Sequence, residues 1–191
     1  DVLVSEVGPR DGLQSIDTIM STKDKKRRIK AEAEAGVREI EVGSFVPAKL
    51  FPQMADTGVI VKYAKTLPGL TVTALVPNFF GAKNAIEAGV DKMCLPLSVS
   101  ETHSQSNLRK SHSEVLKEVE NIVQYINSLE ESKRPEFEGN LSTAFGCTLE
   151  GKVSEDLVLK LGARMMELGC DEIGLPDTTG YANPNQIKRL I

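Results

Sequence analysis

The sequence contains no tryptophan, and aromatic residues make up only 5% of its 191 residues. Proteins that bind single-stranded nucleic acids stack the bases on aromatic rings along a basic groove. This chain has a net charge of −4 and no basic stripe. Nor does any apolar run approach the roughly 18 residues of a membrane-spanning helix. We therefore expect neither a nucleic-acid partner nor a membrane partner.

Cysteine and histidine are also scarce. The three cysteines, Cys94, Cys147 and Cys170, show no Cys-x-x-Cys spacing. An odd number of cysteines without a signal peptide is typical of a reducing compartment. The two histidines, His103 and His112, share no metal-ligand spacing. We predict exposed, non-ligating histidines, and a packed rather than nucleophilic thiol at Cys147.

The remaining composition is that of an ordinary globular protein. Hydrophobic residues make up 40% of the chain and charged residues 26%, and the length suffices for one sizeable core. A local basic cluster at residues 23–30 is predicted to be a solvated helix face, with anion binding as the alternative.

Apolar runs alternate with amphipathic segments along the whole chain and predict six strands and six helices. The strands are expected at residues 2–7, 38–43, 71–76, 92–97, 138–145 and 171–175. The helices are expected at residues 22–35, 56–66, 81–88, 113–129, 155–168 and 184–191, and residues 98–107 are expected to form a polar loop. Alternation of this kind implies a parallel sheet with right-handed crossovers.

Three junctions in the chain resemble one another. Gly36, Gly89 and Gly169 each follow a Glu-Ala or Glu-Leu pair, and each is followed by one apolar residue, two charged residues and another apolar residue. Each reads as a helix end, a glycine in the left-handed conformation and the start of a strand. The repeated junction predicts three αβ units of similar geometry.

Two α/β architectures fit this order of elements. A closed (β/α)8 TIM barrel has eight strands and typically about 250 residues, so residues 1–191 would be its first six βα units in a single incomplete domain. An open doubly wound sheet also fits the count. No Gly-x-Gly-x-x-Gly follows the first strand, which disfavours a dinucleotide-binding fold.

Polar residues follow each predicted strand, at the end where parallel α/β folds carry their chemistry. They are Arg10, Asp11 and Gln14; Glu41 and Ser44; Asn78; Ser98, Ser100 and Glu101; Cys147 and Thr148; and Asp177, Thr178 and Thr179. Carboxylates that face one another are costly unless a cation or an arginine offsets them. Asp11, Glu41 and Asp177 with Arg10 would form such a set.

Most of the residues in this charged set are also consistent with a purely structural role. Arg10 is also consistent with a structural pair with Glu41, which is compatible with catalysis because a pair orients the guanidinium. Asp11 is also consistent with a turn residue before Gly12, and Asp177 with the start of a turn and cap. A purely structural role suits Glu41 less, since buried strands rarely carry an unpaired carboxylate.

Several segments together resemble the hydroxymethylglutaryl-CoA lyase family of metal-dependent TIM-barrel lyases. They are Glu6-Val-Gly-Pro-Arg-Asp-Gly-Leu-Gln14, Ser44-Phe-Val with Pro52-Gln-Met-Ala-Asp56, Val76-Pro-Asn78, Gly146-Cys with Glu150-Gly-Lys152, and Asp177-Thr-Thr-Gly180. The matches are in order and span nearly the whole chain. Arg-Asp-Gly-x-Gln alone marks the wider superfamily, whereas the Gly-Pro-Arg-Asp-Gly-Leu-Gln form is more specific to the lyases.

The resemblance implies cleavage of a 3-hydroxy-3-methylacyl-CoA to acetyl-CoA and a keto acid, as in leucine degradation and ketone body metabolism. It implies a divalent cation, Mg²⁺ or Mn²⁺, an acyl-CoA substrate and a homodimer, in the cytoplasm or the mitochondrial matrix. By the match, Asp11 is a metal ligand, and the catalytic residues are Arg10, Glu41 and Asp177. The substrate-binding residues implied are Gln14, Asn78 and Thr178.

The chain departs from the family pattern in two ways. The family takes further metal ligands from a His-x-His on the seventh strand and from an asparagine beyond it, and these 191 residues contain no His-x-His. Gly174 and Pro176 stand where human-type lyases have serine and glycine, which affects the expected acyl specificity. Two other functions stay open: a truncated chain without catalysis, whose open barrel edge would favour insolubility, and a Claisen-type synthase. The loop at residues 44–56 favours the lyase.

Overall fold

The computed structural model describes residues 2–191, which form two compact units. The first unit comprises the chain up to Cys94 together with Leu129–Glu136, and the second comprises Leu95–Ser128 and Phe137–Ile191. Each unit is an α/β structure in which strands and helices alternate.

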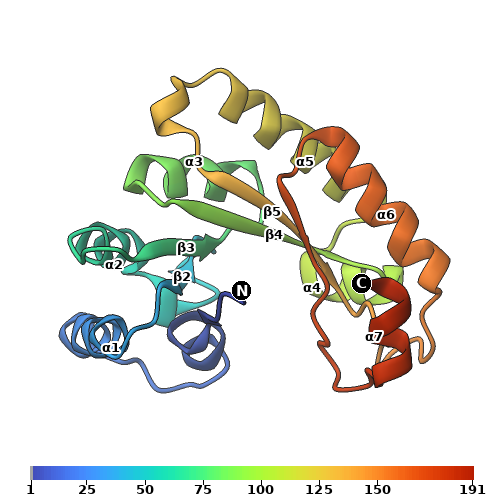
Figure 1. The fold of residues 1–191 in the computed structure, drawn as a ribbon, viewed down its shortest axis with the longest axis horizontal. Coiled ribbons are helices and arrows are strands. Elements are labelled where there is room, and N and C mark those ends of the chain that lie inside the picture. Colours follow the sequence, from blue (N-terminus) through green and yellow to red (C-terminus); the bar gives the residue numbers. More distant parts are fainter. Residues whose placement is uncertain (1) are drawn as a thin grey trace. The chain divides into compact units, whose positions relative to one another are not determined.

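The first unit begins with a strand and a turn that carries the charged motif. Its elements are β1 (Ser5–Glu6), a π-helical turn (Gly8–Gly12), α1 (Thr22–Glu34), β2 (Glu39–Ser44), a 3-10 turn (Pro52–Met54), α2 (Thr57–Ala64), β3 (Thr71–Leu75), α3 (Phe79–Ala88), the start of β4 (Lys92–Ser98) and a 3-10 turn (Glu131–Lys133). Helices α1, α2 and α3 lie in succession along one side of β2 and β3 (Figure 1).

The second unit contains the rest of β4, from Leu95 on, and the helices α4 to α7. Its elements are α4 (Glu101–Leu108), α5 (His112–Asn127), β5 (Glu136–Ser142), α6 (Glu155–Leu168), β6 (Glu172–Gly174) and α7 (Pro184–Leu190). Helices α5 and α6 pack side by side (Figure 1). Arg189 of α7 forms two hydrogen bonds with Glu155 of α6.

The strands are parallel and follow the chain order within each unit. The order is β1-β2-β3-β4 in the first unit and β4-β5-β6 in the second. Every residue of β2 and of β4 is buried, as expected for parallel strands with helices over them. The carboxyl ends of β1 and β2 therefore lie at one edge of the first unit.

Local sequence signals explain most helix boundaries. The Ser21 side chain accepts a hydrogen bond from the Asp24 backbone at the start of α1, and Ser111 and Glu114 form a capping box on α5. Gly36, Gly89 and Gly169 have φ angles of 102°, 90° and 106°, so the predicted left-handed junctions are confirmed.

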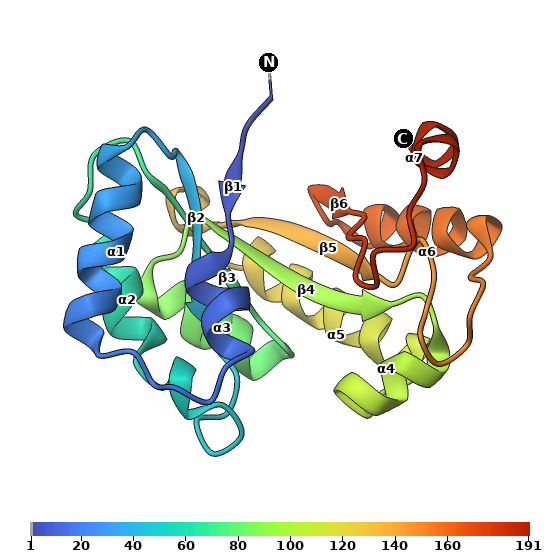
Figure 2. The ribbon, with the colours of Figure 1, turned by 90° about the horizontal axis from the view of Figure 1, so that it is seen from below.

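Two predictions about local structure are wrong. Residues 98–107 contain a helix, α4, because the Ser100 side chain accepts from the His103 backbone and starts it. The predicted strand at residues 2–7 is reduced to Ser5–Glu6, since only these residues pair with β2. The apolar residues before it are not buried: Val2, Leu3 and Val4 are 92%, 61% and 72% exposed, and the segment runs past the start of β2 (Figure 2).

One lysine of the predicted solvated cluster is buried. Lys25 is 4% exposed, pairs with Asp56 at 2.5 Å and donates to the Gln53 carbonyl. The Thr22 hydroxyl donates to the other Asp56 oxygen, 2.6 Å away. These bonds fasten the loop after β2 to α1, and with it the segment that follows Ser44.

We expect Lys25→Met to destabilise the protein by about 3 kcal/mol, because it leaves the Asp56 carboxylate without its buried cation. The matched control is Arg27→Met on the same helix, where the side chain is 82% exposed and the expected change is under about 0.5 kcal/mol. Urea denaturation of the complete protein measures both. Equal midpoints for the two variants would contradict the role assigned to Lys25.

The buried thiol of Cys170 makes the stability of the protein depend on pH in the alkaline range. Burial, with a smaller effect of the Asp171 charge, raises the pKa of Cys170 from its ordinary 9.0 to about 12. The stability linked to this thiol is fully present below the unfolded pKa and is lost as the pH rises toward the folded value. In urea denaturation from about pH 8 to pH 11, Cys170→Ala should lose less stability than the unmodified protein. The same loss in both proteins would contradict this.

Candidate active site

The charged motif lies on the turn that follows β1. The backbone N–H groups of Arg10 and Asp11 both donate to the Val7 carbonyl, at 3.1 and 2.7 Å. A Cβ on Gly8 would lie 2.5 Å from the Glu6 carboxylate and 2.3 Å from the Arg28 guanidinium, so a larger residue would require these two flexible side chains to move. The turn presents Arg10 and Asp11 next to each other at the carboxyl end of β1.

Arg10 forms ion pairs with two carboxylates. Its Nε donates to Glu41 Oε2 at 2.7 Å, and its Nη1 donates to Asp11 Oδ1 at 2.9 Å. Burial lowers the pKa of the guanidinium, but the Glu41 charge, and more weakly that of Asp11, raise it above the ordinary value overall. The two bonds use two of the five N–H donors of the group, so a permanently charged arginine keeps donors for a ligand.

Glu41 is the buried member of the cluster. Its side chain is 5% exposed, and its second oxygen, Oε1, accepts from the Cys94 thiol at 3.2 Å. The alternative that Arg10 pairs with Glu41 is thus confirmed. The contact with Cys94 was not expected from the sequence, although residues on alternate strands of a barrel share a layer, and Glu41 and Cys94 lie on β2 and β4.

Asp11 differs from Glu41 in its exposure. Its side chain is 68% exposed, so its oxygens can contact a solvent-borne ligand. Carboxylate oxygens suit hard divalent cations. No group of three or more His, Cys, Asp or Glu residues within residues 2–191 is arranged to hold a metal ion. Asp11 fits the part of one ligand, and the described residues do not complete a site.

Gln14 and Ser44 connect the loops that follow β1 and β2. The Ser44 hydroxyl donates to Gln14 Oε1 at 2.7 Å, and Gln53 Nε2 donates to the Ile16 carbonyl at 2.6 Å. Since Gln14 uses its carbonyl oxygen here, its amide NH₂ is the group that can donate to a ligand.

Asn78 lines a cavity together with Ser44. The cavity measures about 310 Å³ and is also lined by Phe45, Met54 and Phe80. Asn78 Oδ1 accepts from the Gly81 backbone at 2.9 Å and caps α3. Its NH₂ group is thus the part that suits a ligand contact.

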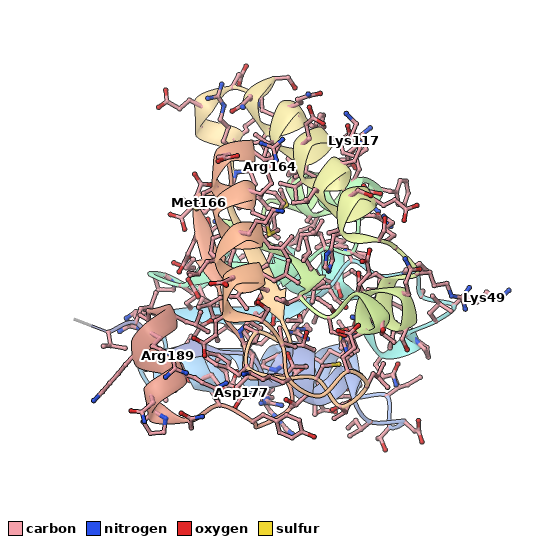
Figure 3. All side chains as sticks on the ribbon, turned by 90° about the vertical axis from the view of Figure 1, so that its right-hand side faces the viewer. Lys49, Lys117, Arg164, Met166, Asp177 and Arg189 are labelled. Atoms are coloured by element: carbon pink, nitrogen blue, oxygen red, sulfur yellow. The ribbon has the colours of Figure 1, made fainter. Side chains whose placement is uncertain are left out.

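Asp177 and Thr178 belong to the second unit, in the loop between β6 and α7 (Figure 3). The Asp177 carboxylate accepts from the backbone N–H groups of Tyr181 and Ala182, at 2.9 and 3.1 Å. The Thr178 hydroxyl oxygen accepts from the Thr143 backbone at 2.9 Å. The turn proposed for Asp177 is therefore present, and Thr178 fastens the loop after β5.

The predicted exposure of the two histidines is wrong. Both are half-buried: His103 Nδ1 lies 2.7 Å from the Ser98 hydroxyl, and His112 Nε2 donates to the Ser98 carbonyl at 2.9 Å. These contacts hold the end of β4 against α4 and α5. The spacing of the two histidines in the sequence does not indicate this role. Their non-ligating character stays a prediction.

Cys147 is buried, so the predicted packed thiol is confirmed. Burial raises the pKa of this thiol, but hydrogen bonds from the Ser100 hydroxyl and from the backbone of Glu150 and Leu149 outweigh burial and bring the pKa below its ordinary value. Thr179, another candidate from the sequence, donates its hydroxyl to the Gly146 carbonyl at 3.1 Å.

Comparison with known proteins gives consistent matches. The chain matches the HMGL-like family over residues 1–191. It is 38% identical over 193 residues to hydroxymethylglutaryl-CoA lyase YngG of Bacillus subtilis, covering 100% of this chain and 62% of that protein. It is 35% identical over 190 residues to the mitochondrial hydroxymethylglutaryl-CoA lyase of Homo sapiens, covering 57% of it. The chain thus spans about six-tenths of the length of these curated relatives.

A solved structure extends the match to the fold. The HMG-CoA lyase of Acinetobacter baumannii, in complex with coenzyme A and 3-methylmalate, is 37% identical, with a TM-score of 0.89 over 98% of this chain and 60% of that one. The predicted fold class is confirmed as the first six βα units of an α/β TIM barrel. By its match over residues 1–191, the chain belongs to the HMGL-like family.

Proposed function

We propose that the protein containing this chain cleaves 3-hydroxy-3-methylglutaryl-CoA to acetyl-CoA and acetoacetate. One observation carries the proposal: Arg10, held by the buried Glu41, stands beside the exposed Asp11 at the carboxyl ends of β1 and β2 in a chain of the HMGL-like family. The coenzyme A in the related Acinetobacter structure supports an acyl-CoA substrate.

The reaction creates negative charge at a position that an arginine can stabilise. A base removes the proton of the C3 hydroxyl, whose oxygen becomes the ketone of acetoacetate as the C2–C3 bond breaks. The electron pair of that bond moves into the thioester and forms an enolate, which takes up a proton to give acetyl-CoA. Arg10 donates to the enolate oxygen, and preorganised donors of this kind are often the largest contribution to catalysis. Glu41 keeps the guanidinium in place and charged.

A divalent cation, Mg²⁺ or Mn²⁺, is proposed as the cofactor, with Asp11 as one of its ligands. When bound, such a cation lowers the pKa of a coordinated hydroxyl group. The exposure of Asp11 and its contact with Arg10 support this role, since the same guanidinium limits the negative charge that accumulates at the site. The remaining ligands would come from parts of the protein outside residues 1–191.

The other site residues receive roles that fit their hydrogen bonds. Gln14 and Asn78 use their carbonyl oxygens within the protein, so we assign their NH₂ groups to substrate oxygens. The Asp177 carboxylate is oriented by two backbone N–H groups, and we assign it to orienting the substrate or accepting a proton. Thr178 is assigned to substrate binding through the loop it fastens.

Further properties belong to the same proposal. Residues 1–191 would form part of one barrel domain, and the complete protein would be a homodimer in the cytoplasm or the mitochondrial matrix. The mitochondrial name of the human relative supports the second compartment. No helix within residues 2–191 is both long and apolar enough to cross a membrane. We propose no nucleic-acid partner and no membrane partner.

Substitution of Arg10 tests the mechanism. In the complete protein, Arg10→Gln should lower kcat at least about 1,000-fold, because the enolate oxygen loses its charged donor, while titration calorimetry should show that Mn²⁺ still binds. Asp11→Ala should instead weaken Mn²⁺ binding. The control is Arg27→Gln, an exposed arginine on α1. Turnover by Arg10→Gln at the level of this control would contradict the assignment.

A substrate panel tests the reaction itself. Acetyl-CoA release is measured by a coupled assay for a series of 3-hydroxy-3-methylacyl-CoAs of increasing acyl length. Release from 3-hydroxy-3-methylglutaryl-CoA, with acetoacetate in equal amount, is the expected result. Release of acetyl-CoA only from other acyl-CoAs of the series would contradict the proposed substrate. If condensation of acetyl-CoA with a keto acid is the favoured direction, the protein is a synthase. Absence of any turnover would support a non-catalytic protein.

A further inference from the structure

Cys94 contacts the charged cluster from a strand that carries none of its other members. It lies on β4, is 8% exposed, and its thiol donates to Glu41 Oε1 at 3.2 Å. Glu41 lies on β2, and β3 separates the two strands. The registers place Glu41 beside Thr73 and Thr73 beside Lys92, so Cys94 is two residues further along β4.

This contact follows from the architecture of the barrel. Side chains that point inward from alternate strands form one layer, and side chains on β2 and β4 can therefore meet across β3. A carboxylate at the β2 position needs donors for both of its oxygens, because a buried oxygen without a donor is costly. Arg10 provides the donor for Oε2 and Cys94 the donor for Oε1.

The two bonds together fix the orientation of the carboxylate. With Oε2 bonded to Arg10 alone, the Glu41 carboxylate would keep a soft rotation about its terminal bond. The second bond restricts that rotation, and with it the direction of the Arg10 guanidinium. A thiol is a weak, uncharged donor, so it orients the carboxylate and leaves its charge to Arg10.

We propose that Cys94 is a positioning residue for the lyase reaction, which acts through Glu41 to hold Arg10 in the orientation that the enolate oxygen requires. The inference rests on the proposed function for its catalytic meaning. The geometric part, that Cys94 restrains Arg10, stands on the contacts alone.

The first measurement is steady-state kinetics of the complete protein. Cys94→Ala should lower kcat about 10-fold and change KM by less than about twofold, as expected for an interaction that matters in the transition state. Cys94→Ser keeps a donor and should recover kcat to within about threefold of the unmodified protein. Cys170→Ala, another buried cysteine outside the cluster, is the control and should leave kcat unchanged.

The second measurement does not depend on turnover. Solvent exchange of the Arg10 Nε proton, followed by ¹⁵N NMR, should be faster in Cys94→Ala than in Cys94→Ser or the unmodified protein. Unchanged exchange and unchanged kcat in Cys94→Ala would overturn the proposal. Equal losses in the Ala and Ser variants would overturn it in favour of a packing role. Failure of the unmodified protein to cleave the substrate would remove the proposed function, whereas the exchange result would still decide whether Cys94 positions Arg10.

Discussion

The ion pair between Arg10 and Glu41 is the interaction on which the site depends. A buried carboxylate is unfavourable unless it is paired and hydrogen-bonded, and Glu41 is 5% exposed within a wholly buried strand. The ion pair with Arg10 offsets the cost of burying the Glu41 carboxylate. The same pair fixes the position of the Arg10 guanidinium and raises its pKa. The pair thus keeps a cation at the carboxyl end of the strands, and in the proposed reaction this is where negative charge develops.

The surrounding contacts keep this pair at the end of the strands. The Val7 carbonyl closes the turn that carries Arg10, and the Ser44 hydroxyl bonds Gln14 on the same connection. Lys25 and Asp56 fasten the following loop to α1. The segments of the family motif therefore divide into two kinds: residues that can contact a ligand, and residues that hold the loops that carry them.

Periodicity and local motifs were sufficient for most of the fold. The alternation of strands and helices, the left-handed glycines and the position of Arg10 beside Asp11 could all be predicted, because they depend on short-range patterns. Long-range contacts could not. The residues next to Cys94 and Lys25 in the chain do not indicate that either side chain has a partner on another element. Residues 2–4 are exposed because only Ser5 and Glu6 pair with β2, which the local sequence could not show. The α4 helix was missed because its polar sequence has no apolar stripe, and its start depends on one serine cap.

The central claim is that Glu41 holds Arg10 where it stabilises the thioester enolate. Exchange of the acetyl-CoA methyl protons in D₂O, followed by NMR, measures formation of that enolate without cleavage of a carbon–carbon bond. The complete protein should catalyse this exchange, and Glu41→Gln should slow it at least about 10-fold while acetyl-CoA still binds. An unchanged exchange rate in Glu41→Gln would contradict the account.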